Sequence, residues 1–173
     1  MYKFLEKLKD NKTLCEIYYN DFDKFDVGFV LNVDETWFIF ASYKPNGKRD
    51  GYMVINEDKV NRIVYKSKYI DRITRLMDDR NIVYPFPFTD CNILTLTLNY
   101  LKREQKIANI EILDDMSLSI NGYVKDIEND YLFIDEVDSY GDVYKSSVIK
   151  ISTISFIEFD GEEEVLIQKF IKK

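Results

Sequence analysis

The sequence contains no histidine, only two cysteines and no long apolar run. Because imidazole is absent, the chain has no Ser/His or Cys/His nucleophile pair and no zinc site with histidine ligands. Cys15 and Cys91 belong to no Cys-x-x-Cys pair, so we expect two reduced thiols rather than a disulfide or a nucleophile. Carboxylate or lysine catalysis stays possible in principle, but no motif indicates it. The sequence therefore predicts a non-catalytic protein with no cofactor, metal ion or small-molecule substrate.

No segment approaches the roughly 20 apolar residues that a membrane helix requires. Charged side chains interrupt Met1–Lys12, which therefore lacks the apolar centre of a signal peptide. The 173 residues are 46% hydrophobic and 32% charged, a composition typical of soluble globular proteins. We accordingly expect a cytoplasmic protein that binds no membrane.

The net charge of −7 is distributed unevenly along the chain. Residues 1–79 carry 14 basic and 14 acidic side chains, whereas residues 80–173 carry 10 basic (24 − 14) and 17 acidic ones (31 − 14). A protein that binds duplex nucleic acid normally presents a basic face. The overall charge therefore argues against strong nonspecific nucleic-acid binding.

Two stretches of the sequence match each other at a spacing of 94 residues (122 − 28). The alignment runs without a gap from residues 28–63 to residues 122–157. The identical pairs are Gly28/Gly122, Val30/Val124, Gly47/Gly141, Val54/Val148, Ile55/Ile149 and Ile63/Ile157. Since an internal repeat decides how a whole fold is interpreted, the sequence predicts repeat 1 at 1–79, a linker at 80–92 and repeat 2 at 93–173.

Each repeat is expected to contain a short helix, five strands and an amphipathic closing helix, which makes the fold class α+β and mainly β. Apolar residues at helical spacing predict the opening helices, with Phe4, Leu5 and Leu8 in repeat 1 and Leu94, Leu98 and Leu101 in repeat 2. β-Branched and aromatic residues predict strands near 14–20, 26–34, 36–43, 51–56 and 60–65, with counterparts at 107–113, 120–128, 130–137, 143–149 and 153–159. Ser67 and Gly161 would start the closing helices. Five short strands suit a small bent sheet or barrel.

The linker contains the run Tyr84-Pro85-Phe86-Pro87-Phe88. Its alternating prolines exclude a helix and remove the backbone donors that a sheet needs. We interpret it as an extended linker. The alternative is an aromatic arm that docks on a partner or on the protein itself.

Two motifs in each repeat resemble those of the Sm-like family, and in particular its bacterial Hfq branch. The first is matched by Gly28, Val30, Val33, Asp34 and Trp37, and again by Gly122, Val124, Ile127, Glu128 and Tyr131. The second is matched by Ile55, Val60 and Ile63, and again by Ile149, Ile154 and Ile157. The resemblance implies two tandem Sm-like five-stranded small barrels, each with an N-terminal helix and a C-terminal amphipathic helix. The glycine would be needed because a strongly bent strand has no room for a β-carbon.

The residues with which RNA-binding members of that family hold a base are replaced. Phe38 and Leu132 stand at the asparagine position of the first motif, and Asn56-Glu57 and Lys150-Ile151 replace the Arg-Gly of the second. The Lys-His pair of the Hfq branch is missing because the chain has no histidine. The resemblance therefore implies the framework and not the usual base pocket.

A basic loop beside aromatic residues is the candidate RNA or ligand site. It comprises Tyr43, Lys44, Lys48, Arg49 and Tyr52 of repeat 1. Such a loop could hold phosphates and stack bases, although an ordinary solvated turn has the same composition. The matching loop of repeat 2, residues 135–142, is acidic. It could hold a hard cation, but it lacks EF-hand spacing and is better interpreted as a solvated loop.

Two further pairs of residues are given structural roles. Trp37 and Tyr131 follow the strand alternation, so we expect core packing rather than a platform for stacking bases. Asp34 and Glu128 fall at a turn between strands, where a carboxylate can accept hydrogen bonds from backbone N–H groups.

These patterns predict a protein-interaction or assembly adaptor that uses sheet edges or the linker, with a protein partner or self-association. The alternative is an RNA-binding Sm-like protein whose contacts with single-stranded RNA are confined to repeat 1. A basic surface confined to repeat 1 would favour RNA, whereas an unpaired edge strand would favour the adaptor.

Overall fold

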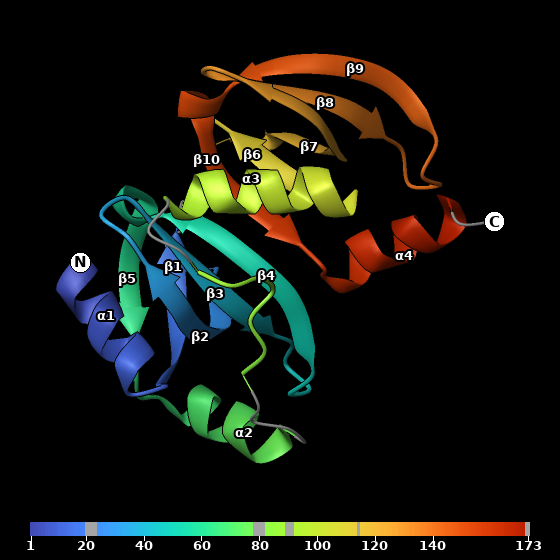
Figure 1. Cartoon of the computed structure of the whole chain (residues 1–173). Helices are drawn as coiled ribbons and strands as arrows, with labels where there is room; N and C mark the ends of the chain where they lie inside the picture. Colours follow the sequence, from blue (N-terminus) through green and yellow to red (C-terminus); the bar gives the residue numbers. More distant parts are fainter. Residues whose placement is uncertain (20–23, 78–81, 89–91, 114, 172–173) are drawn as a thin grey trace. The chain divides into compact units, whose positions relative to one another are not determined.

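Each half of the chain consists of a helix, five strands and a closing helix in the same order, as the computed structural model shows (Figure 1). The structure describes residues 1–19, 24–77, 82–88, 92–113 and 115–171, so Cys91 lies outside the described residues. The chain divides into a first unit, Met1–Ile93, and a second unit, Leu94–Lys173.

The first unit has five antiparallel strands in the order β5-β1-β2-β3-β4 in its described segments. Its elements are α1 (Tyr2–Asp10), β1 (Leu14–Tyr19), β2 (Asp26–Val33), β3 (Trp37–Tyr43), β4 (Arg49–Asn56), a 3-10 turn (Glu57–Lys59), β5 (Val60–Val64) and α2 (Lys68–Leu76). Leu5 and Leu8 form the buried face of α1. Ser67 begins α2 as predicted, because its hydroxyl accepts a hydrogen bond from the Ile70 N–H at 3.0 Å.

The second unit repeats this order as β10-β6-β7-β8-β9. Its elements are α3 (Ile93–Glu104), β6 (Ile107–Ile112), β7 (Asp115–Glu128), β8 (Tyr131–Val137), β9 (Val143–Lys150), a 3-10 turn (Ile151–Thr153), β10 (Ile154–Phe159) and α4 (Glu162–Ile171). Three glutamates occupy the first turn of α4, where they complement the helix dipole.

The spacing of 94 residues seen in the sequence holds in the structure. The third strands span 37–43 and 131–137, the fourth strands 49–56 and 143–150, and each pair starts and ends 94 residues apart. The bulge in β2 between Val30 and Asn32 recurs in β7 between Val124 and Asp126. The repeat is therefore confirmed at the level of individual strand positions.

The prediction of two five-stranded small barrels is wrong, because the sheet is open. In the described part of the chain β5 pairs with β1 alone and β9 pairs with β8 alone. Closure would require β5 to pair with β4 in the first unit and β10 to pair with β9 in the second. Barrel closure depends on strand tilt and stagger, which the alternation of apolar residues does not record. The helices lie where the sequence predicts them, but they accompany open sheets.

The glycine near the start of β2 is required by a close approach to β3. A β-carbon on Gly28 would lie 2.0 Å from the Ala41 carbonyl oxygen. The same holds in the second unit, where a β-carbon on Gly122 would lie 2.5 Å from the Asp135 carbonyl oxygen. Both glycines are thus explained by backbone contact within the sheet.

In both units the hairpin between the third and fourth strands packs against the closing helix. Gly47 has a φ of +80°, and a β-carbon there would lie 2.5 Å from the Leu76 carbonyl oxygen of α2. Gly141 has a φ of +83°, and its β-carbon would lie 2.4 Å from Cγ1 of Ile171 in α4. Glycine meets both requirements, since it tolerates a positive φ and adds no side chain.

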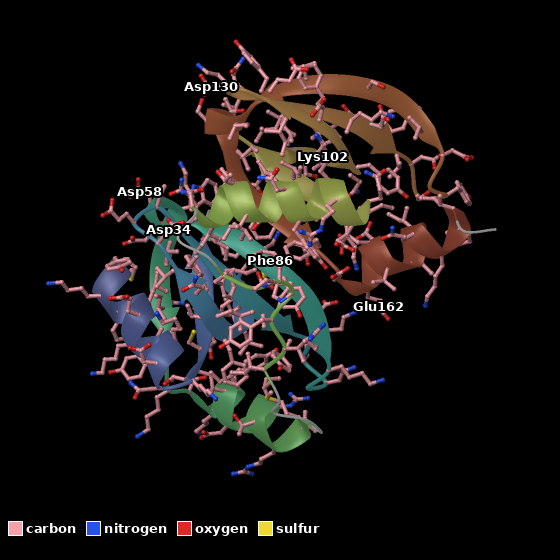
Figure 2. All side chains as sticks on the ribbon, in the orientation of Figure 1. Asp34, Asp58, Phe86, Lys102, Asp130 and Glu162 are labelled. Atoms are coloured by element: carbon pink, nitrogen blue, oxygen red, sulfur yellow. The ribbon has the colours of Figure 1, made fainter. Side chains whose placement is uncertain are left out.

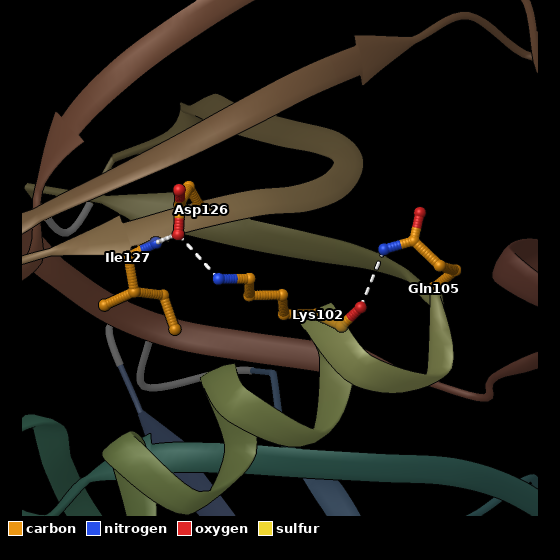
Figure 3. A network of polar contacts seen from close by, with 4 residues as sticks. All are labelled: Lys102, Gln105, Asp126 and Ile127. Carbon is orange, nitrogen blue, oxygen red and sulfur yellow. Dashed lines mark hydrogen bonds and ion pairs between the residues drawn. The ribbon is translucent and has the colours of Figure 1, made fainter.

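Helix α3 is fixed to β7 at the bulge (Figure 3). The Lys102 ammonium lies 2.6 Å from Oδ1 of Asp126, and the Ile127 N–H donates to the same oxygen at 2.8 Å. The Lys102 ammonium first, and then the Ile127 N–H, lower the pKa of the Asp126 carboxyl. At the end of α3 the Gln105 amide donates to the Lys102 carbonyl at 2.7 Å.

The fourth strands of the two units differ in burial. All seven residues of β3 are buried and so is the middle of β4, whereas β9 exposes six of its eight residues. Exposed apolar area of this kind often marks an interaction site, so β9 is the candidate functional surface.

Candidate functional site

Strand β9 forms one end of the sheet in the described residues, so one of its edges carries no strand. Three of its apolar side chains are exposed: Val143 by 56%, Tyr144 by 63% and Val148 by 55%. An edge strand presents backbone N–H and C=O groups that can pair with another chain. Apolar side chains on such an edge add contact area for the incoming strand.

The position of β9 is fixed by a buried carboxylate on β8. Glu136 accepts hydrogen bonds from the Tyr144 hydroxyl at 3.0 Å and from the Ser147 hydroxyl, and its Oε2 lies 3.0 Å from the Lys145 ammonium. Burial alone would raise the pKa of the Glu136 carboxyl. The hydrogen bonds from Ser147, Lys145 and Tyr144 outweigh burial and hold that pKa below its ordinary value. The carboxylate therefore ties three successive parts of β9 to β8.

A second carboxylate bridges three strands of the same unit. Asp135 on β8 accepts a hydrogen bond from the Ser146 hydroxyl of β9 at 2.7 Å, and its Oδ2 lies 3.1 Å from the Lys125 ammonium of β7. The Ser146 hydroxyl first, and then Lys125, lower the pKa of the Asp135 carboxyl. With both carboxylates engaged, β9 is held in an extended conformation before any partner binds.

The hairpin that leads into β9 extends the exposed apolar area. Tyr140 at its tip is exposed and contacts Phe170 of α4 edge-on, with the ring centroids 6.3 Å apart. Leu166 of α4 is exposed as well. We name Tyr140, Val143, Tyr144, Val148 and Phe170 together the β9 surface.

The candidate site predicted in repeat 1 is only partly accessible. Lys48 and Arg49 are exposed, whereas Lys44 lies 3.6 Å from Oδ1 of Asp50. The Arg49 guanidinium lies 4.8 Å from the centroid of the Tyr52 ring. The hairpin thus presents two exposed cations beside one that is paired with a carboxylate.

The two tyrosines of that site are buried. Tyr43 packs edge-on against Phe29 at 5.7 Å, and the Tyr52 hydroxyl donates to the Val83 carbonyl at 3.0 Å. In this conformation neither ring is presented to solvent as a stacking surface. The sequence places both residues beside the loop correctly, but alternation along β3 and β4 did not show that both rings turn inward.

The acidic loop between β8 and β9 forms a local turn. Oδ1 of Asp138 accepts the backbone N–H groups of Tyr140 at 2.9 Å and Asp142 at 3.0 Å. Such a carboxylate satisfies backbone donors as in an Asx turn. Within the segments that the structure describes, no three acidic or thiol side chains come together to hold a metal ion.

The aromatic and acidic pairs of the two motifs differ between the units. Trp37 is buried as predicted, but the prediction of core packing is wrong for Tyr131, which is 49% exposed at the start of β8. Oδ1 of Asp34 accepts the N–H groups of Thr36 at 2.8 Å and Trp37 at 2.7 Å, which confirms the turn role. Glu128 is exposed at the equivalent turn.

The Pro/Phe segment packs on itself around a buried phenylalanine (Phe86, Figure 2). The Phe88 ring contacts the rings of Phe86 and Tyr84 at centroid distances of 5.5 and 5.7 Å. These side chains line an open, shallow depression of the surface. The hydrogen bond from Tyr52 to Val83, just before the segment, attaches it to β4 of its own unit.

Burial raises the pKa of the Cys15 thiol to about 12, with a smaller contribution from Glu16. At neutral pH this thiol is protonated and buried, so it is not an activated nucleophile. No helix in the described part of the chain is long and apolar enough to cross a membrane.

No family model matches the sequence, and a search of curated proteins finds no significant match.

Proposed function

We propose that this protein is a non-catalytic interaction module that binds an extended segment of a protein partner by pairing it with β9. The observation that carries this proposal is the exposed edge strand, paired with β8 alone in the described residues and flanked by apolar side chains. Backbone hydrogen bonds would supply the affinity, and the β9 surface would select apolar side chains at alternate positions of the partner.

Strand β9 has little of the protection that edge strands usually have, which supports the same proposal. Natural edges are commonly protected by outward-pointing lysines, prolines or bulges. The chain has no proline between 88 and 173, and the ammonium of Lys145 lies against Glu136, so the one protective feature of β9 is a bulge at Tyr144, where its pairing with β8 shifts register. Lys150, at the far end of β9, is exposed and would favour an acidic residue in the partner.

A kinship with the Sm-like family is part of the proposal. It is supported by the strand order repeated in both units and by the glycines that permit close approach of the second and third strands. We propose the cytoplasm as the site of action, since Cys15 is a free thiol. The other function predicted from the sequence, RNA binding through the hairpin, is supported by the exposed Lys48 and Arg49 alone.

The test combines peptide selection with hydrogen exchange. A displayed library of random extended peptides is selected on the intact protein, and amide exchange is then measured with and without a selected peptide. We expect peptides with alternating apolar residues, together with slower exchange of the β9 amides. Val148→Lys should abolish binding, because it places a solvated charge on the edge.

The matched control is Leu113→Lys, which removes an exposed leucine of the same unit and adds the same charge outside β9. It should bind the selected peptides as the unmodified protein does. Protection confined to segments other than β9, or equal losses in the two variants, would contradict the proposal.

A further inference from the structure

A half-open groove lies in the first unit between α2 and the turn that joins α1 to β1. Its volume is about 390 Å³. Apolar side chains supply most of its described lining: Leu14, Phe29, Tyr65, Ile70, Met77 and Ile82. Lys12, Thr13 and Thr74 complete it. A mainly apolar hollow of about 300–1,000 Å³ with a few polar groups is typical of sites that bind small molecules.

The three polar residues of the groove have counterparts in the second unit. Strand β6 starts 93 residues after β1, and α4 starts 94 residues after α2. At these spacings the counterparts of Lys12, Thr13 and Thr74 are Gln105, Lys106 and Gln168. Lys12 and Gln105 have a positive φ, of 47° and 50°, so the two turns also agree in backbone conformation.

In the second unit the counterparts form polar bridges at this place. The Gln168 amide of α4 donates to the Gln105 carbonyl at 2.8 Å, and the Lys106 ammonium lies 2.7 Å from Oδ1 of Asp160, just before α4. The hollow beside these bridges, of about 280 Å³, is lined mainly by charged and polar residues. The same place in the fold is thus polar and bridged in the second unit, whereas in the first unit it is apolar.

The side chains at the first-unit positions are shorter. Threonines at 13 and 74 stand where the second unit has lysine and glutamine, and the Thr74 hydroxyl donates to the Ile70 carbonyl of its own helix at 2.8 Å. Leu14, Phe29 and Ile70 are buried beside them, so the groove reaches the apolar interior of the unit. Occupation by an apolar ligand would remove more of this surface from water.

One cation stands at the rim of the groove. Lys12 is exposed, and none of the ion pairs between described residues includes it. No described residue of the lining is acidic. An apolar molecule with a single negative charge at one end complements this combination of apolar walls and one positive charge.

We propose that the groove binds a medium-chain fatty acid, with its acyl chain against the apolar lining and its carboxylate beside Lys12. A water-sized group occupies about 30 Å³, so the groove holds about a dozen non-hydrogen atoms, which is the size of decanoate. This site is separate from the β9 surface, which belongs to the second unit, and it requires no extended peptide.

Isothermal titration calorimetry of the intact protein with decanoate, octanoate and decanol tests the proposal. Each methylene withdrawn from water contributes about fourfold to affinity, so octanoate, which is two methylenes shorter, should bind about 15-fold more weakly than decanoate. Lys12→Gln should weaken decanoate binding by about 1.5- to 5-fold, as for an exposed ion pair, and leave the binding of uncharged decanol unchanged. Glutamine is suitable here because Gln105 has the same positive φ at the equivalent turn.

Filling the groove provides the second test. Thr74→Trp places a large side chain in the lining and should abolish decanoate binding. The matched control is Gln168→Trp, the same replacement at the equivalent position of the second unit, which should bind decanoate as the unmodified protein does. Circular dichroism shows whether both variants fold, and the comparison of decanoate with decanol for Lys12→Gln decides if Thr74→Trp does not. No binding of decanoate at millimolar concentration, equal losses in the two tryptophan variants, or equal effects of Lys12→Gln on decanoate and decanol would overturn the proposal.

Discussion

Replacing Gly28 with alanine tests the close approach of β2 and β3. The added β-carbon would lie 2.0 Å from the Ala41 carbonyl oxygen and 2.7 Å from a ring carbon of Phe40. Ordinary contacts of this kind begin near 3.4 Å, so the strands would have to separate by about 1.4 Å at a position where both are buried. A flexible side chain could move aside, but a backbone carbonyl within a sheet cannot do so without breaking its pairing.

The expected cost follows from two terms. Overpacking a buried site costs about 1–3 kcal/mol, and each β2–β3 hydrogen bond lost adds about 1 kcal/mol. We therefore expect Gly28→Ala to lower the free energy of unfolding by about 3 kcal/mol or more. For Gly122→Ala, whose β-carbon would lie 2.5 Å from the Asp135 oxygen, we expect about 1–3 kcal/mol. Ser119→Ala, at an exposed position of β7, should change the free energy of unfolding by less than about 0.5 kcal/mol.

Urea unfolding followed by tryptophan fluorescence measures the first of these effects. The single tryptophan, Trp37, is buried in β3 and reports on the first unit. With a slope of about 1–3 kcal/mol per molar urea, a loss of 3 kcal/mol lowers the midpoint by about 1–3 M. Circular dichroism follows Gly122→Ala and Ser119→Ala. A midpoint for Gly28→Ala equal to that of the unmodified protein would refute the close approach as the reason for glycine.

Two further predictions concern the second unit and the assembly. The folded-state pKa of Glu136 lies below its ordinary value of 4.5, so its contribution to stability is complete above pH 4.5 and is lost as the pH falls through the lower folded-state pKa. Glu136→Gln should therefore destabilise the protein at pH 7 and reduce the loss of stability on acidification. A variant that loses stability in acid as the unmodified protein does would contradict this role. The unmodified protein should be a monomer or a small oligomer by light scattering, because the two repeats supply ten strands within one chain, and a stable ring of six or seven subunits would exclude this.

Much of the secondary structure is readable from local patterns. The helical spacing of Leu94, Leu98 and Leu101 predicted the opening helix of repeat 2, and α3 is that helix. The turn role of Asp34 was predictable because a carboxylate after a strand accepts nearby N–H groups.

The sequence by itself determined the repeat of 94 residues, the strand positions within it and the charge of each loop, because these depend on residues that are neighbours along the chain. Only the tertiary structure decided that Tyr43 and Tyr52 turn inward while Tyr131 turns outward, and that among the described strands the sheets stay open and β9 pairs with β8 alone. Each of these outcomes depends on contacts between residues that are far apart in the sequence, and such contacts produce no periodic pattern along the chain.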